Sequence, residues 1–281
     1  MSIHNPHDHI LHPKDLLAAY GLQPKKSLGQ NFLFDENVLA RIAESAVIHP
    51  TDHVLEIGPG LGSLTHFLAR QAAQVVAVEL DDRLLPILQG QLALYENVRL
   101  IHGDILKQQP ADLFQQPYKV VANVPYYITG AILRHLLTAV LKPLSLTMTV
   151  QQEVAERITA EPPNMSLLAV SVQFYGKATI AHTIKAGAFW PRPDVDSAVV
   201  HIDLTQPAAT GVSLAQERPF MRLVKVGFAQ KRKQLQKNLR ALGHDRSLID
   251  AALERAGVDG RRRAETLTLA EWGALFQAMP I

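Results

Sequence analysis

Apolar residues are grouped in two ways along the middle of this chain: in short continuous runs, and in longer stretches where they recur every three or four positions. The short runs predict strands and the longer stretches predict helices. The strands fall at 53–57, 75–79, 98–102, 119–122 and 145–150, and the helices at 64–72, 83–94 and 131–141. Repeated alternation of strand and helix favours an α/β fold in which helices wrap a parallel sheet. Ligands of such sheets bind at the carboxyl ends of the strands.

The segments on either side of this region have different patterns. Residues 1–24 are polar and are predicted to form an N-terminal tail, with a short helix at 14–20. Asp35 is expected to cap the helix that follows it. The segment 205–211 has the composition of a linker, and only helical periods follow it, at 220–242, 247–256 and 269–279. The predicted parts are a tail at 1–24, an α/β domain at 25–205 and a small all-helical domain at 206–281.

The composition of the chain bears on its cellular compartment and on the distribution of its charge. The 281 residues include no cysteine, which excludes a disulfide framework and is compatible with a reducing cytoplasm. No apolar run reaches the roughly 18 residues of a membrane helix, and no signal peptide is recognisable, so no membrane association is expected. The formal net charge is +2, yet residues 218–263 hold 13 Lys and Arg against 4 Asp and Glu. That local excess of +9 leaves −7 for the remainder, which indicates an acidic body and a basic region facing a polyanion.

Four histidines stand close together near the N-terminus, at His4, His7, His9 and His12. Such a cluster is compatible with a metal site. No second cluster of ligands supports that interpretation, and a solvated tail explains the same residues. We therefore expect no metal.

Three strand ends carry candidates for binding a nucleotide-like ligand. The strand at 53–57 runs into a turn containing Gly58, Gly60 and Gly62, where glycine allows the backbone to approach a ligand closely. Glu79 ends the next strand, 21 residues beyond Gly58, at the spacing of an acid that binds ribose hydroxyls. Asp104 follows the third strand and is placed to accept a hydrogen bond from an adenine amino group. A tight structural turn, a solvated acid and a turn aspartate are the respective alternatives.

The segment Asn123-Val124-Pro125-Tyr126 is the catalytic candidate. It resembles the N/D-P-P-Y/F/W motif of enzymes that methylate an exocyclic or amide nitrogen. An adenine N6 amine is a poor nucleophile because its lone pair is delocalised into the ring. The side-chain oxygen of Asn123 and the carbonyl of Pro125 would accept its two hydrogens and localise that lone pair, while Tyr126 stacks on the base. The alternative is a proline turn with a core tyrosine.

The chain as a whole resembles the bacterial small-subunit ribosomal RNA adenine dimethyltransferase family, with a Rossmann-like S-adenosylmethionine-dependent methyltransferase domain. The resemblance covers the chain from about Lys25 to the C-terminus. Its blocks are Gly29–Leu33, Glu56–Gly62, Asn123–Ile128, Gln152–Arg157, Phe189–Ser197 and a basic helix at Phe228–Leu239. One departure is Met165-Ser166, where the family usually has Tyr-Gly; we expect this segment near the substrate side, where it would affect the fit of the RNA.

The resemblance implies the cofactor and the substrate. S-adenosylmethionine would contact Asn31, Leu33, Gly58, Glu79, Asp104 and Asn123. Two adjacent adenosines in the 3′-terminal hairpin loop of 16S rRNA would become N6,N6-dimethyladenosines during small-subunit biogenesis. Substrate contacts would come from Tyr126, from Phe189 as a second aromatic wall or a plain hydrophobic anchor, and from Lys231, Arg232, Lys233 and Lys237 on RNA phosphates. A monomer acting on the small subunit or its precursor is expected.

Other functions fit parts of the same sequence. The related large-subunit dimethylase of the macrolide-resistance type shares the catalytic motif. A non-catalytic RNA- or DNA-binding relative would share the fold, but the intact Asn123, Pro125 and Tyr126 speak against it. A DNA adenine or protein glutamine methyltransferase is a weaker alternative. The basic run at 231–233 also fits a merely solvated charged face.

Overall fold

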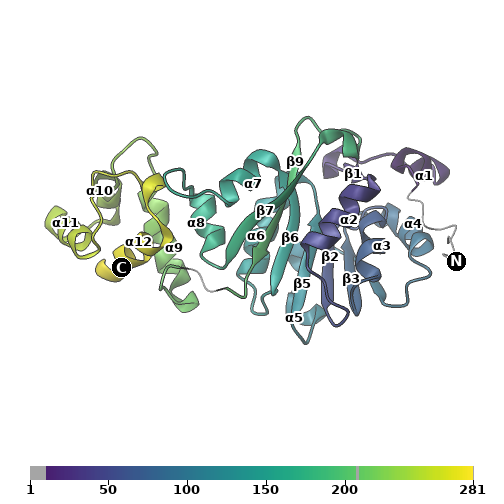
Figure 1. Cartoon of the computed structure of the whole chain (residues 1–281), viewed down its shortest axis with the longest axis horizontal. Helices are drawn as coiled ribbons and strands as arrows, with labels where there is room; N and C mark the ends of the chain where they lie inside the picture. Colours follow the sequence, from purple (N-terminus) through teal and green to yellow (C-terminus); the bar gives the residue numbers. More distant parts are fainter. Residues whose placement is uncertain (1–10, 207–208, 281) are drawn as a thin grey trace. The chain divides into compact units, whose positions relative to one another are not determined.

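A computed structural model of the chain describes residues 11–206 and 209–280. The chain divides into two compact units (Figure 1), the first comprising Met1–Ala155 and Thr179–Asp203 and the second comprising Glu156–Ala178 and Leu204–Ile281. The sequence had suggested a single cut near residue 205. The second unit also takes residues 156–178, because the apolar face of the helix within that segment is buried in the helical core.

The first unit is built on a seven-stranded sheet with the order β4-β3-β2-β5-β6-β9-β7. Its strands are β2 (His53–Ile57), β3 (Gln74–Glu79), β4 (Val98–His102), β5 (Tyr118–Asn123), β6 (Ser145–Gln151), β7 (Lys177–Ile184) and β9 (Ser197–Asp203). The five strands predicted from the sequence pair in parallel, whereas β9 pairs antiparallel with β6. The sheet is therefore mixed, and the sequence reading missed β7, β9 and the small sheet of β1 (Phe32–Leu33) with β8 (Phe189–Trp190).

Helices cover the central strands, whose successive residues are almost all buried. The helices are α2 (Glu36–Ser45), α3 (Ser63–Ala69), α4 (Leu85–Gln91), α5 (Pro110–Leu113), α6 (Thr129–Leu137) and α7 (Gln152–Ile158). Figure 1 shows α2 and α3 lying over the sheet, where Ile42 and Leu68 pack with Val54 and Val75. Asp35 caps α2 as expected, its Oδ1 accepting from the Val38 amide at 3.1 Å.

The N-terminal segment from residue 11 onward is packed, which corrects the prediction of a tail. Helix α1 (Pro13–Ala19) buries Leu16 and Leu17 against Ile87 and Leu88 of α4. Its N-cap is His12, whose Nδ1 accepts from the Lys14 amide at 3.2 Å. His4, His7 and His9 lie outside the described residues.

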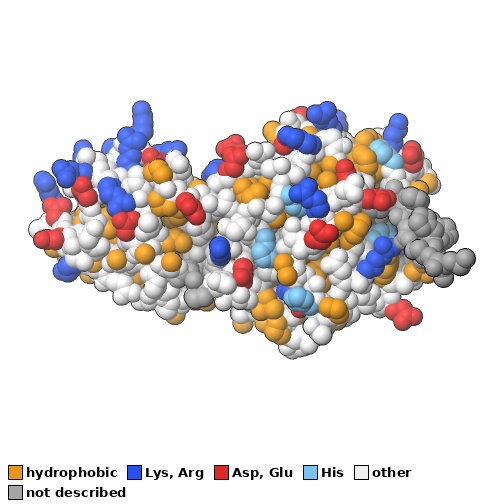
Figure 2. Space-filling view, viewed as in Figure 1, with side chains coloured by type: hydrophobic (Ala, Val, Ile, Leu, Met, Phe, Trp, Pro, Cys, Tyr) orange, Lys and Arg blue, Asp and Glu red, His pale blue; other side chains and the backbone are white. Residues whose placement is uncertain are grey.

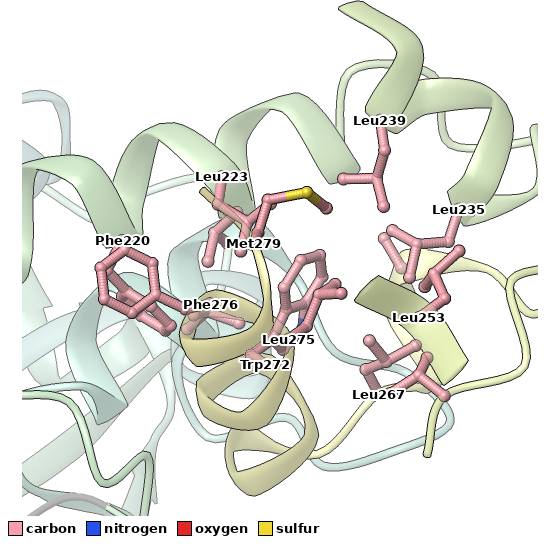
Figure 3. Close-up of a cluster of buried hydrophobic side chains, with 14 of the residues drawn as sticks. Phe220, Leu223, Leu235, Leu239, Leu253, Leu267, Trp272, Leu275, Phe276 and Met279 are labelled. Carbon is pink, nitrogen blue, oxygen red and sulfur yellow. The ribbon is translucent and has the colours of Figure 1, made fainter. Parts of the chain in front are cut away.

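The second unit is all-helical within its described residues. It contains α8 (Leu167–Gln173), α9 (Glu217–Gly227), α10 (Leu235–Leu239), α11 (Arg246–Arg255) and α12 (Leu269–Ala278). Their apolar faces meet in one cluster (Figure 3), in which Trp272 and Phe276 of α12 face Phe220 and Leu223 of α9. The segment expected to be a linker, 205–211, packs against this core near its end. Thr210 is buried, and its carbonyl oxygen would lie 1.7 Å from a Cβ added to Gly273.

The predicted helix at 220–242 is wrong, because the chain leaves the helix after Gly227 and re-enters one at Leu235. The Leu235 amide bonds the Arg262 carbonyl at 2.8 Å instead of continuing a helix. Buried Asn238 fixes the break by donating to the Gly227 carbonyl at 2.6 Å and to the Gln230 carbonyl at 3.1 Å. The basic run at 231–233 therefore lies in a turn and not on a helix.

Met165 and Ser166, the departure from the family pattern, have packing and capping roles in the second unit. Met165 is buried in the helical core, and Ser166 caps α8 by accepting from the Ala169 amide at 3.0 Å. Its hydroxyl also donates to the Arg157 carbonyl at 3.0 Å. The expectation that this segment affects the fit of the RNA stays a prediction.

Candidate active site

The first unit contains a pocket with about 1130 Å³ of space not filled by protein atoms, solvent at its mouth included. It lies at the carboxyl ends of the parallel strands, beside β2, from which the sheet grows in both directions. Such a switch point is where α/β sheets bind ligands. The predicted residues around it are Asn31, Leu33, Gly58, Glu79, Asp104, Asn123, Pro125, Tyr126 and Phe189.

The glycine positions of the turn after β2 are closely packed against other residues. Gly58 and Gly60 have φ angles of +67° and +60°, which residues with a Cβ rarely adopt. A Cβ on Gly58 would lie 3.2 Å from Val124 Cγ1, and one on Gly60 would lie 3.2 Å from Phe32 Cδ1. The turn thus brings its backbone against two other walls of the pocket.

Glu79, at the end of β3, shapes this turn. Its Oε2 accepts from the Gly60 amide at 3.0 Å and its Oε1 accepts from the Asp81 amide at 2.8 Å. Burial raises the pKa of Glu79, although these two amide donors stabilise the charged form. Each carboxylate oxygen has a second lone pair, so ribose hydroxyls can still be bound.

Asp104 has a local role beside its place in the pocket. Its Oδ1 accepts from the Leu106 amide at 3.0 Å and so starts the turn after β4. The turn interpretation and the ligand interpretation of this residue are therefore compatible.

Glu56 was not singled out from the sequence, although it stands within the glycine-rich block. It lines the pocket, is 1% exposed, and its Oε2 has no hydrogen-bond partner among the described residues. Burial raises the pKa of this carboxyl to about 8, with a further contribution from the neighbouring charge of Glu79. Glu56 is therefore protonated at neutral pH when nothing occupies the pocket. An unpartnered carboxyl oxygen here fits a site that receives a cationic or hydrogen-bonding ligand.

The substitution Glu56→Gln is expected to flatten the fall in stability between about pH 4.5 and 8. The folded-state pKa lies above the unfolded value, so the carboxyl adds stability below pH 4.5 that is lost as the pH rises through about 8. Thermal unfolding between pH 5 and 8.5, without ligand, should show the wild-type melting temperature falling by several degrees more than that of Glu56→Gln, about 2–4 °C for each kcal/mol. Parallel pH curves for the two proteins would contradict the elevated pKa.

The catalytic candidates follow β5. Asn123 ends this strand, and the Pro125 carbonyl accepts from the Ile128 amide at 3.2 Å, which leaves it one lone pair for a substrate. The Tyr126 hydroxyl is 2.7 Å from Oγ of Ser197, a fully buried residue at the start of β9. Burial raises the pKa of Tyr126, so the phenol is neutral. The sequence assigns Ser197 no role, although it belongs to one of the blocks that carry the resemblance. Its contact with the phenol hydroxyl fixes the position of the tyrosine ring.

Residues 25–33, called the strap below, contribute a further wall of the pocket through residues 28–33. Leu33 pairs with Phe189 in the two-stranded sheet, and Asn31 Nδ2 donates to the Gly29 carbonyl at 3.1 Å. Phe189 is 4% exposed, lines the pocket and packs in the core, as a hydrophobic anchor would. Its role as a second aromatic wall for the base stays a prediction.

The predicted phosphate contacts belong to the second unit. Lys231, Arg232, Lys233 and Lys237 are all exposed. Figure 2 shows Lys and Arg side chains gathered along one edge of this unit. Their participation in RNA binding stays a prediction.

Two features are absent from residues 11–206 and 209–280. No group of three His, Cys, Asp or Glu side chains is arranged there to hold a metal ion. No helix in that part of the chain is both long and apolar enough to cross a membrane.

Comparisons with known proteins agree with this geometry. Residues 21–279 match the family described as ribosomal RNA adenine dimethylase. A protein called ribosomal RNA small subunit methyltransferase A from Dehalococcoides mccartyi (strain CBDB1) is 46% identical over 265 residues, or 93% of this chain and 90% of its own. The protein of that name from Geobacillus thermodenitrificans (strain NG80-2) is 42% identical over 278 residues, 95% of this chain and 94% of its own.

Solved structures show the same fold. The 23S rRNA methyltransferase ErmE is 31% identical, with a TM-score of 0.74 over 89% of this chain and 100% of its own. A dimethyladenosine transferase from Plasmodium falciparum is 24% identical, with a TM-score of 0.76 over 87% of this chain and 95% of its own.

Proposed function

Because this chain belongs to the ribosomal RNA adenine dimethylase family, we propose that it methylates N6 of two adjacent adenosines in the 3′-terminal hairpin loop of 16S rRNA. The products would be N6,N6-dimethyladenosines, made during small-subunit biogenesis. The observation that carries the proposal is the meeting of the glycine-rich turn, the acids Glu79 and Asp104, and the segment 123–126 around one pocket.

S-adenosylmethionine would supply an activated methyl group on its sulfonium. The backbone at Gly58 and Gly60 lets a ligand approach the turn, and the buried Glu79 carboxylate accepts from ribose hydroxyls. Asp104 accepts from the amino group of the cofactor's adenine. The remaining proposed cofactor contacts are Asn31, Leu33 and Asn123. The unpartnered Glu56 oxygen and the glycines of the turn are the features of this pocket that fit such a ligand.

The substrate adenine would lie between Tyr126 and Phe189, with its amine toward Asn123. In the first transfer the Asn123 amide oxygen and the Pro125 carbonyl would accept the two N6 hydrogens, which localises the lone pair for attack on the methyl group. The S–C bond breaks as the N–C bond forms, S-adenosylhomocysteine leaves as a neutral thioether, and N6 then loses one proton to solvent. Ser197 keeps the Tyr126 ring in place through the 2.7 Å contact, so that the base is oriented before reaction. Orientation and hydrogen bonding are sufficient for this chemistry, and we propose that no metal takes part.

Selection of the small-subunit rRNA is supported by the relatives. Those named for the small subunit are more similar to this chain than ErmE, which is named for 23S rRNA. The large-subunit activity is the second candidate. We further propose a cytoplasmic monomer that binds the small ribosomal subunit or its precursor.

The test is transfer of labelled methyl groups from S-adenosylmethionine to unmethylated 30S particles, followed by nucleoside analysis. The expected product is N6,N6-dimethyladenosine in 16S rRNA. Naked 16S rRNA, 23S rRNA, DNA and protein serve as comparison substrates. Transfer to 23S rRNA alone would replace the proposal by the large-subunit activity, and cofactor binding without any transfer would favour a non-catalytic relative.

Charge reversal of Lys231, Arg232 and Lys233 to glutamate is expected to weaken RNA binding and flatten its salt dependence. Each lost phosphate contact removes about one unit from the slope of log K against log salt, so the slope should fall by about 2 to 3. Binding to 16S rRNA at several salt concentrations measures this. Arg246→Glu is the control, because Arg246 is already paired with Asp250 at 3.3 Å. An unchanged slope in the triple variant would make the turn a solvated surface.

A further inference from the structure

The strap forms a wall of the pocket but is paired into a sheet only at its C-terminal end. Phe32 and Leu33 are paired with β8, and the Phe34 amide bonds the Ala188 carbonyl at 3.2 Å. The N-terminal half contains only a single turn of 3₁₀ helix at Lys26–Leu28. A segment of this kind needs another attachment to keep one conformation.

Gln30 supplies that attachment with both ends of its amide. Its Oε1 accepts from the Lys25 amide at 2.7 Å, which closes the strap on itself. Its Nε2 donates to Asp81 Oδ2 at 2.8 Å, 51 residues away in the sequence. The strap is thus tied to the segment that follows β3.

Asp81 is a fixed acceptor for this bond. It is 2% exposed. Arg83 donates to it twice, from Nε to Oδ1 at 2.8 Å and from Nη2 to Oδ2 at 2.6 Å. The Arg83 guanidinium, helped by Gln30, holds the pKa of Asp81 below its usual range, so the carboxylate stays ionised. Charge-assisted bonds of this type are stronger than neutral ones.

The same contacts continue to the glycine-rich turn. The Asp81 amide donates to Glu79 Oε1 at 2.8 Å, and Glu79 Oε2 accepts from the Gly60 amide at 3.0 Å. Gln30, Asp81, Glu79 and Gly60 therefore form one hydrogen-bonded chain that joins two walls of the pocket. The position of the strap is coupled to the carboxylate proposed to bind ribose.

We propose that Gln30 and Asp81 are positioning residues, whose hydrogen bond latches the strap against the pocket and so sets the affinity and residence time of S-adenosylmethionine. The inference rests on the proposed function for the identity of the cofactor alone. Without the latch the strap samples other conformations, and the apparent affinity falls by the fraction of molecules in the binding-competent one. The strap also opens more often in the cofactor-bound protein once the latch is lost, so the dissociation rate is expected to rise as well.

Gln30→Glu tests the latch selectively. The glutamate keeps an acceptor for the Lys25 amide but turns a second oxygen toward the Asp81 carboxylate, so only the latch is broken. We expect about tenfold weaker S-adenosylmethionine binding by calorimetry and a matching rise in dissociation rate by stopped flow. Gln30→Met, which removes the donor without adding charge, should act in the same direction. Gln116→Glu adds the same charge to the first unit outside the pocket lining and should leave the affinity unchanged.

Exchange of donor and acceptor gives the reciprocal test. In the double variant Gln30→Glu with Asp81→Asn, the new amide at position 81 donates to the new carboxylate at position 30. This variant should bind S-adenosylmethionine more tightly than Gln30→Glu alone. If the losses of binding free energy of the two single variants simply add in the double variant, the latch is overturned.

Amide hydrogen exchange in the cofactor-free protein separates the latch from the proposed function. Amides of residues 26–33 should exchange faster in Gln30→Glu than in wild type, while those of β2 and β5 should not change. Unaltered exchange in the strap would overturn the inference, even if methyl transfer to 30S particles is confirmed. Faster exchange would support the latch even if the wild-type protein methylates another substrate.

Discussion

Asn123→Ala is expected to lower the rate of methyl transfer to 30S particles by about 10²–10³-fold, the loss seen when one preorganised hydrogen-bonding group is removed from a transition-state site. Binding of S-adenosylmethionine should be weakened far less, because Asn123 is one of several proposed cofactor contacts, whereas its proposed bond to the N6 amine strengthens as the amine reacts. Asn123 ends β5 and lines the pocket, so its amide is available there for a substrate. Single-turnover transfer and calorimetry measure the two quantities separately.

Thr149→Val is the matched control for this experiment. Thr149 lies opposite Asn123 in the register of β5 and β6, is 1% exposed and does not line the pocket. Its hydroxyl has no hydrogen-bond partner among the described residues, so valine should fit with little change in transfer rate or binding. Equal losses of transfer and cofactor binding in Asn123→Ala would contradict a catalytic role for the amide.

Glu79→Ala is expected to weaken S-adenosylmethionine binding by about 100-fold. Two hydrogen bonds from ribose hydroxyls to a buried carboxylate would each contribute about 1.5–3 kcal/mol. The loss of affinity also includes the effect on the glycine-rich turn, because the Gly60 and Asp81 amides would no longer have their acceptor. Calorimetric titration of the cofactor-free protein gives the affinity directly.

Two further variants divide this effect. Glu79→Gln keeps the size of the side chain and one acceptor oxygen, so it should fall between wild type and Glu79→Ala. Asp82→Ala removes an exposed acid from the same segment, outside the pocket lining, and should bind normally. Unchanged affinity in Glu79→Ala would remove this residue from the ribose site.

The five predicted strands of the central sheet are confirmed. Four of them are almost entirely buried, as mostly apolar runs of this length should be, whereas β4 lies at the edge of the sheet and keeps exposed positions. The position of the site followed from the same pattern. Residues after parallel strands meet at one edge, so the glycine-rich turn, Glu79, Asp104 and Asn123 had to lie near one another. Their location around one pocket agrees with that expectation, and their roles stay predictions.

The local pattern of apolar residues does not predict every element correctly, and the second unit gives an example. The apolar period between Phe220 and Leu242 is helical, but the tertiary bonds of Leu235 and Asn238 end one helix and start another. Residues 11–24 follow a polar start rich in histidine and were predicted as part of a tail, yet the apolar positions of α1 pack it on α4. Met165 is buried for a similar reason. Its burial depends on the packing of α8 in the second unit, which the neighbouring residues do not predict.

The sequence by itself determined the alternation of strands and helices, the glycine-rich turn, the order of candidate residues after each strand, and the excess of positive charge after residue 218. These depend on local spacing and on residue type, which a linear pattern carries. Only the tertiary structure decided the contacts between distant segments: Ser197 behind Tyr126, Gln30 on Asp81, and the unpartnered Glu56. Hydrogen bonds between residues 51 or 71 positions apart, and the burial that shifts a carboxyl pKa, arise when separate segments pack together.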